Sequence, residues 1–94
     1  MTMYLLCSVD KSRGKSSLVW WRPETRGYTQ HLDAAGTYNE HEARRLASPT
    51  SFAVPEEVAV ASSAGKRVPA AEIERLRLHR RAIRVEEPQA EARP

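Results

Sequence analysis

The chain has 94 residues, of which 40% are hydrophobic and 29% charged, a balance typical of a globular protein rather than a disordered one. That length suits one domain with a single modest core. The single cysteine excludes an internal disulfide, and no apolar run approaches the roughly 18 residues that span a bilayer, so no membrane association is expected. The N-terminal residues also lack the basic start of a secretion signal, which favours the cytoplasm.

The net charge is +3 and the pI is about 9.4, so the chain is mildly basic. Such a charge leaves room for an anionic partner, either a nucleic acid or an acidic protein face. A solvated, arginine-rich surface without any anionic partner is the alternative, because so small an excess is a weak electrostatic signal. Composition alone therefore does not decide between protein binding and nucleic-acid binding.

The first element expected is a strand over residues 3–9, where apolar side chains occupy both faces. A strand of this kind lies inside a sheet or is covered on both sides. Cys7 falls within it and is interpreted as a small core residue, because no pattern of thiol catalysis surrounds it. Residues 10–16 follow as a polar hairpin loop. Its basic side chains are candidate contacts for a phosphate backbone or an acidic protein face, with simple solvation as the alternative: Lys11, Arg13 and Lys15.

Residues 17–22 are rich in β-branched and aromatic side chains and stop before a proline, which predicts a second strand. Because side chains alternate along a strand, Trp20 and Trp21 point to opposite faces. We therefore expect one tryptophan in the core and the other on an exposed or partly covered face. Residues 23–27, with proline early and glycine late, are typical of a turn.

Residues 28–32 are expected to return as a third strand. Asn39, followed three positions later by Glu42, has the pattern of a capping box, in which each side chain satisfies a free backbone amide. This signal predicts a short helix over residues 40–47. The helix should end before Pro49, because the residue preceding a proline disfavours helical geometry.

The second half of the chain begins with a short extended segment over residues 50–54, which is expected to contribute to the core. Pro55 and the two glutamates after it indicate the start of a helix, and Gly65 indicates its end. Residues 58–61 within this helix form a short apolar run, so a strand is the alternative there.

The last helix is expected to start at Val68 and to run to about Arg84. Its arginines spread around the helix at about 100° per residue, so no single groove-reading face is specified. Solvation is the alternative role for these candidate contacts, which are Arg75, Arg77, Arg80, Arg81 and Arg84. Residues 86–94 are acidic and contain proline, and we expect them to form a disordered tail after a single domain over residues 1–85.

These elements predict an α+β fold, with a small antiparallel sheet of about three strands packed with two or three helices. A metal site is not predicted, because no pair among Cys7, His31, His41 and His79 has the spacing of zinc ligands. The sequence also lacks glycine-rich cofactor motifs and nucleophile motifs. We therefore expect no cofactor and no enzymatic activity.

Several short motifs resemble a family of small proteins encoded by phages and prophages. They are Tyr4-Leu5-Leu6-Cys7-Ser8, the loop from Lys11 to Lys15, Trp20-Trp21-Arg22-Pro23, Gly27-Tyr28, Ala35-Gly36-Thr37-Tyr38 and the helix start from Glu40 to Ala43. The resemblance covers the first half of the chain well and the second half loosely. It implies a mobile-element origin and action inside a bacterial host cell, where accessory proteins of this size often bind and inhibit a host defence complex.

Three hypotheses of function follow from these observations. The first is a non-enzymatic protein that inhibits a host defence machine, such as a CRISPR effector complex, by binding it through Trp21, Arg22, Tyr28 and Tyr38. Ordinary sheet packing is the alternative role for these side chains, above all for Tyr38. The second is nucleic-acid binding through the basic loop 11–15 and the basic helix 70–84. The third is a structural or assembly role as a homo-oligomer.

Overall fold

The hydrophobic N-terminal segment forms a central strand of a four-stranded antiparallel sheet, as its apolar residues on both faces predict. The computed structural model describes residues 2–77. Its strands are β1 (Tyr4–Ser8), β2 (Val19–Trp21), β3 (Tyr28–Thr29) and β4 (Ser51–Pro55), in the order β3-β2-β1-β4. The α-helices are α1 (Val9–Ser12), α2 (Glu40–Leu46) and α3 (Glu56–Ala61), and the 3-10 turns are η1 (Pro23–Thr25), η2 (Leu32–Ala34) and η3 (Ala70–Glu72). The α+β class is confirmed, and the expected extended segment joins the sheet as β4.

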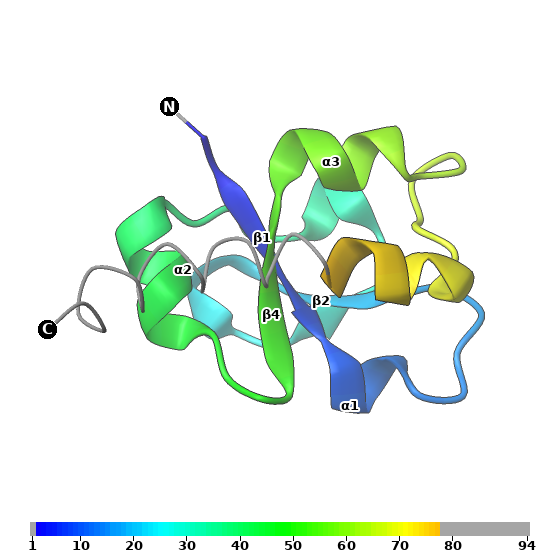
Figure 1. The fold of residues 1–94 in the computed structure, drawn as a ribbon, viewed down its shortest axis with the longest axis horizontal. Coiled ribbons are helices and arrows are strands. Elements are labelled where there is room, and N and C mark those ends of the chain that lie inside the picture. Colours follow the sequence, from blue (N-terminus) through cyan, green and yellow to red (C-terminus); the bar gives the residue numbers. More distant parts are fainter. Residues whose placement is uncertain (1, 78–94) are drawn as a thin grey trace, which may run out of the picture.

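Alternation along β1 creates one core on each face of the sheet. Leu5 and Cys7 belong to the larger core, together with Leu18, Trp20, Phe52, Val54, Ala59, Val68 and Leu76. Tyr4 and Leu6 belong to the smaller core, together with Tyr38, Ala43 and Ala53. In Figure 1, α3 and the yellow-to-orange segment 70–77 lie to one side of β1, and α2 lies to the other. Helical segments therefore cover both faces.

The two adjacent tryptophans separate as alternation predicts. Trp20 is fully enclosed in the larger core, and its Nε1 has no hydrogen-bond partner among the described residues. Trp21 packs on the opposite face at the margin of the smaller core, where it is half-buried. Only Trp21 is therefore placed to contribute to a surface.

Cys7 is fully buried and lies in register with Trp20 on one neighbouring strand and Phe52 on the other. Desolvation by burial raises the pKa of its thiol from 9.0 to about 12, against the smaller opposing effects of Ser12 and Arg77. Cys7 therefore remains a neutral thiol at physiological pH. This state fits a core residue and not a nucleophile.

The segment after β1 is a helix, whereas the sequence predicts a hairpin loop over residues 10–16. Ser8 caps α1, because its Oγ accepts a 3.2 Å hydrogen bond from the amide of Lys11. The Ser12 hydroxyl donates to the Ser8 carbonyl at 2.6 Å and accepts from the amide of Val19 at 2.8 Å, which fixes the return of the chain to β2. The hairpin-loop prediction is therefore wrong at its start, because serine side chains stabilise a helical turn there.

The returning strand is shorter than the predicted range of residues 28–32, because β3 ends at Thr29. The Oγ1 of Thr29 accepts a 3.1 Å hydrogen bond from the amide of His31, and this local turn competes with strand pairing. The amide of Leu32 donates instead to the carbonyl of Lys66 at 2.7 Å, where η2 begins.

In the second half the expected elements occur in order, with shifted boundaries. The capping box of α2 is confirmed, since Asn39 Oδ1 accepts from the Glu42 amide at 2.8 Å and Glu42 Oε1 accepts from the Asn39 amide at 3.1 Å. The strand alternative for residues 58–61 is wrong, because they lie in α3. Pro55 is the last residue of β4, so the helix starts one residue later than expected.

β4 forms one edge of the sheet, and its pairing with β1 determines which backbone groups face outward. The amide of Val9 donates to the Thr50 carbonyl, and the amide of Glu56 donates to the Met3 carbonyl. Every second pair of an antiparallel ladder is hydrogen-bonded, so the Cys7–Phe52 pair is hydrogen-bonded as well. The alternate residues of β4 direct their backbone groups to the outer edge, namely Ser51, Ala53 and Pro55. Ser51 exchanges two hydrogen bonds with Ser48, at 2.7 and 3.1 Å.

The last helical segment starts later than predicted, because Val68 continues an extended stretch. The amide of Leu18 donates to the Val68 carbonyl at 2.8 Å, and η3 and the helical residues 73–77 follow. The remainder of the predicted helix and the predicted tail over residues 86–94 lie outside the described residues. Within residues 2–77, the helices are too short and too polar to cross a membrane.

Candidate functional site

Trp21 and Tyr28 form an aromatic pair in the β2–β3 hairpin, next to its turn. They are directly opposite each other in the strand register, and their ring centroids are 4.4 Å apart with an interplanar angle of 42°. The Nε1 of Trp21 donates a 3.1 Å hydrogen bond to Ser51 Oγ on β4, which fixes the indole across the sheet face. Tyr28 remains 38% exposed. The pair therefore combines a fixed geometry with an accessible ring.

Lys11 completes this surface from α1. Its Nζ lies 5.3 Å from the centroid of the Tyr28 ring, within the range of a cation–π interaction. No carboxylate among residues 2–77 forms an ion pair with Lys11. We call Lys11, Trp21 and Tyr28 the aromatic-lysine patch. The patch joins one candidate from the predicted basic loop to two candidates from the predicted aromatic set.

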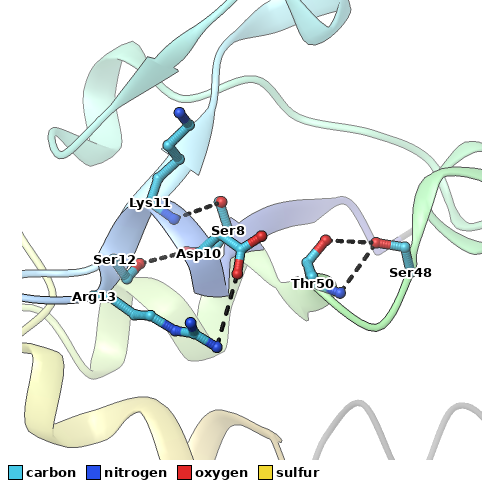
Figure 2. A network of polar contacts seen from close by, with 7 residues as sticks. All are labelled: Ser8, Asp10, Lys11, Ser12, Arg13, Ser48 and Thr50. Atoms are coloured by element: carbon cyan, nitrogen blue, oxygen red, sulfur yellow. Dashed lines mark hydrogen bonds and ion pairs between the residues drawn. The ribbon is translucent and has the colours of Figure 1, made fainter.

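The polar contacts around α1 determine which basic side chain reaches the patch (Figure 2). The Ser8 cap fixes the first turn, and the amide of Val9 donates to the Thr50 carbonyl at 2.8 Å. Figure 2 shows the side chain of Lys11 extending upward, while the guanidinium of Arg13 is joined to the carboxylate of Asp10. Arg13 lies 3.9 Å from Asp10, and both side chains are largely exposed. Arg13 is therefore engaged weakly by Asp10, while Lys15 is exposed in the following loop.

The turn beyond the aromatic pair has an unusual backbone. Arg22 and Gly27 close it, with a 2.9 Å hydrogen bond from the Arg22 amide to the Gly27 carbonyl. Glu24 and Thr25 both have positive φ angles, of 58° and 54°, and the amide of Arg26 donates to the Pro23 carbonyl at 3.2 Å. Two consecutive positive φ values within such a turn are the pattern of a type I′ turn, which normally carries asparagine and glycine.

Tyr38 supports this turn from inside the protein. Its hydroxyl donates to the Arg22 carbonyl at 2.6 Å and accepts from the Thr25 amide at 3.1 Å, while the residue itself is only 4% exposed. Tyr38 is also paired with Tyr4 through two backbone hydrogen bonds of 2.7 and 2.8 Å. As a buried residue it offers no contact surface of its own. It can affect binding only through the turn that it holds.

Gly36 packs against the same turn. Its amide donates to the Trp21 carbonyl at 2.9 Å, and a Cβ at this position would lie 2.6 Å from Pro23 Cα. Only glycine fits so close to the backbone of another segment. We call residues 22–27 the buttressed turn, because Gly36 and Tyr38 hold it from behind.

Arg22 does not join the aromatic-lysine patch. Alternation along the strand directs it to the sheet face opposite Trp21, and its Cδ lies 3.7 Å from the place that a Cβ on Gly27 would occupy. Its side chain is exposed and has no ion-pair partner among the residues that the structure describes. The structure therefore separates it from Trp21 and Tyr28.

The basic helix is only partly described. Arg75 contacts Glu72 at 2.5 Å and donates to Ser62 Oγ at 2.6 Å, and Arg77 lies 3.5 Å from Glu74. These local carboxylates reduce the positive charge that the two arginines offer to a partner. The other candidate arginines of this helix lie outside the described residues: Arg80, Arg81 and Arg84.

A shallow groove of about 430 Å³ lies at the start of α3, lined by Met3, Glu56, Glu57, Val60 and Ala61. Sequence analysis does not single it out, because its apolar residues come from two distant segments. In residues 2–77, no group of three or more potential metal ligands comes together.

The positive φ angles of Glu24 and Thr25 are not predicted from the sequence. The sequence offers only the early proline and late glycine of residues 23–27, which indicate a turn but do not specify the sign of φ at Glu24 and Thr25. The role of Ser51 as partner of Trp21 has no signal in the sequence, since it depends on the relative placement of β2 and β4.

No protein-family model, no curated protein and no solved structure matches this chain.

Proposed function

We propose that the protein acts without catalysis, by binding a partner protein through the aromatic-lysine patch. The observation that carries this proposal is the Trp21–Tyr28 pair, which is accessible at Tyr28 and held at Trp21 by Ser51. Exposed aromatic side chains that are fixed before binding lose little conformational freedom on association. Tyrosine and tryptophan are also the residue types that dominate the energetics of protein interfaces.

The partner we propose is a defence complex of the bacterial host, such as a CRISPR effector, which the protein would inhibit after entering the cell with a phage or other mobile element. Two observations support this setting. The motifs between Tyr4 and Ala43 resemble phage and prophage proteins, and the chain is a small domain that carries the partly exposed Trp21–Tyr28 pair.

The experiment is the capture of host proteins by the tagged chain in a bacterium with an active CRISPR system, at moderate salt. Tyr28→Ala is the test variant, and Val60→Ala is the matched control, because Val60 is the other large hydrophobic residue that is exposed within residues 2–77. Retention of a stoichiometric defence complex by the wild type and by Val60→Ala, with loss in Tyr28→Ala, would support the proposal. Failure of the wild type to retain any host protein would overturn it.

Nucleic-acid binding is a second candidate, favoured by the position of Lys11 over the Tyr28 ring. A cation beside an accessible aromatic ring is a combination that single-strand binding proteins use for phosphates and bases. The test is fluorescence anisotropy of a labelled single-stranded oligonucleotide at increasing salt. Binding that weakens steeply with salt and is lost in Lys11→Ala would support this function, whereas no change in anisotropy at low salt would exclude it.

A further inference from the structure

We propose that the buttressed turn is a preformed recognition tip, whose exposed side chains at Glu24, Thr25 and Arg26 enter a concave polar site on the partner protein. This inference rests on the proposed function and goes further, because it names a second contact region and the shape of the surface that receives it.

The backbone of the tip is costly for the residues that occupy it. A residue other than glycine is disfavoured in the left-handed region, and two such residues, Glu24 and Thr25, are adjacent here. A β-branched threonine is among the least suited residues for this region. Asparagine followed by glycine would reverse the chain at lower cost. The Thr25 hydroxyl donates to the Glu24 carbonyl at 2.5 Å within the turn, yet the backbone cost remains, and we infer that both side chains serve contacts outside the turn.

The support of the tip comes from residues that do not reach the surface. Tyr38 bonds the turn at both the Arg22 carbonyl and the Thr25 amide, and Gly36 allows a second segment to lie against Pro23. These contacts hold the turn in one conformation before any partner arrives. A recognition element that is already ordered loses less entropy on binding, which is the advantage of rigid inhibitor loops.

The charge of the tip favours a protein partner over a nucleic acid. Glu24 and Arg26 form an exposed ion pair, with 3.5 Å between Arg26 Nε and Glu24 Oε1, so the charges of these two side chains offset each other at the tip, and Arg22 lies at the end of the turn next to β2. A phosphate backbone would be repelled by the carboxylate as much as it is attracted by the guanidinium. A concave protein site that offers both a donor and an acceptor matches such a pair. Separating this exposed ion pair also costs little free energy, because surface pairs contribute little to stability.

The test compares variants of the tip in binding and in stability. The probe is the host complex retained by the wild-type chain in the capture experiment, purified and immobilised on a biosensor. For Thr25→Gly we expect a tip that is more stable yet binds at least about tenfold more weakly, because glycine relieves the positive φ but removes the contacting side chain. Tyr38→Phe should weaken binding about three- to tenfold through loss of the two supporting hydrogen bonds. Asp33→Asn is the control, since Asp33 and Lys66 form another exposed ion pair, at 3.1 Å, outside the tip.

The outcomes separate the two proposals. A Thr25→Gly chain that binds the complex as tightly as the wild type, while Tyr28→Ala does not bind, would overturn the recognition tip and leave the proposed function intact. Equal binding by Tyr28→Ala and the wild type would overturn the aromatic-lysine patch, while weaker binding by Thr25→Gly would still support the tip. If the wild type retains no host protein, both proposals fail together.

Discussion

The hydroxyl of Tyr38 donates a 2.6 Å hydrogen bond to the carbonyl of Arg22, and this bond links a buried side chain to an exposed turn. It also brings together short segments that lie far apart in the sequence. The segments 20–23, 27–28 and 35–38 all meet at this turn, through Gly36, Tyr38 and the Trp21–Tyr28 pair. These three segments therefore encode a supported hairpin.

Tyr38→Phe should lower the free energy of unfolding by about 1 kcal/mol, because it removes one donor and one acceptor at the turn while keeping the ring in the smaller core. The loss stays small since the freed backbone groups lie at the surface and can bond to water. Urea denaturation followed by far-UV circular dichroism measures it. Unfolding at the same urea concentration as the wild type would show that the hydroxyl contributes nothing to the turn.

Gly36→Ala should destabilise the protein by more than about 2 kcal/mol, because the new Cβ would lie 2.6 Å from Pro23 Cα and the backbone has to move. Gly14→Ala is the control. It has a positive φ of 75° but open space around the added atom, so only the conformational cost of about 1 kcal/mol applies. Thermal unfolding of both variants compares the two effects. Equal losses would mean that the contact with Pro23 is relieved by a small shift.

The stability of the protein should decrease as the pH rises from about 9 to about 12. In the unfolded chain the Cys7 thiol ionises near its ordinary pKa of 9.0, whereas burial raises the pKa in the folded protein to about 12. The folded state therefore holds this proton more tightly, and its advantage is complete below pH 9 and lost through that window. Cys7→Ala should show a smaller loss of stability over the same range. Parallel pH profiles for the two proteins would contradict the assignment to Cys7.

Acrylamide should quench the fluorescence of the two tryptophans to different extents. Trp20→Phe leaves only the half-buried Trp21, whose emission should be quenched readily, while Trp21→Phe leaves only the enclosed Trp20, which should be protected. Stern–Volmer plots of the two variants give the comparison. Equal quenching in both would place the two indoles in similar surroundings, contrary to the strand alternation.

Much of the fold follows from local signals. Pro23 ends β2, the Asn39–Glu42 box starts α2, and the apolar residues of β1 indicate a central strand. The errors arise where side-chain hydrogen bonds compete with the expected backbone pattern. The Ser8 side chain caps α1 where a loop is predicted, and the hydrogen bond to Thr29 Oγ1 ends β3 early. Such competition depends on single hydroxyl groups, which hydrophobic periodicity does not detect.

The candidate site is less accessible to sequence analysis than the fold. The sequence singles out Trp21 and Tyr28 as aromatic residues on strands, but the contact of Lys11 with Tyr28 depends on α1, which is not predicted. The grouping of Arg22 with Trp21 fails for the opposite reason, because alternation already places the two side chains on different faces. Contacts between distant segments require the sheet order, and no local pattern contains it.

The outer edge of β4 bears on how the protein behaves at high concentration. Exposed strand edges present free backbone donors and acceptors that recruit strands from other molecules, which is a route to aggregation. In β4 the outward groups of Ser51 are already bonded to Ser48, and Pro55 has no amide hydrogen to donate. Among the outward-facing residues of β4, the amide of Ala53 remains to pair with another strand. One amide is too short a template for the addition of a strand. This edge of the sheet is therefore closed to pairing with a second copy of the chain along most of β4.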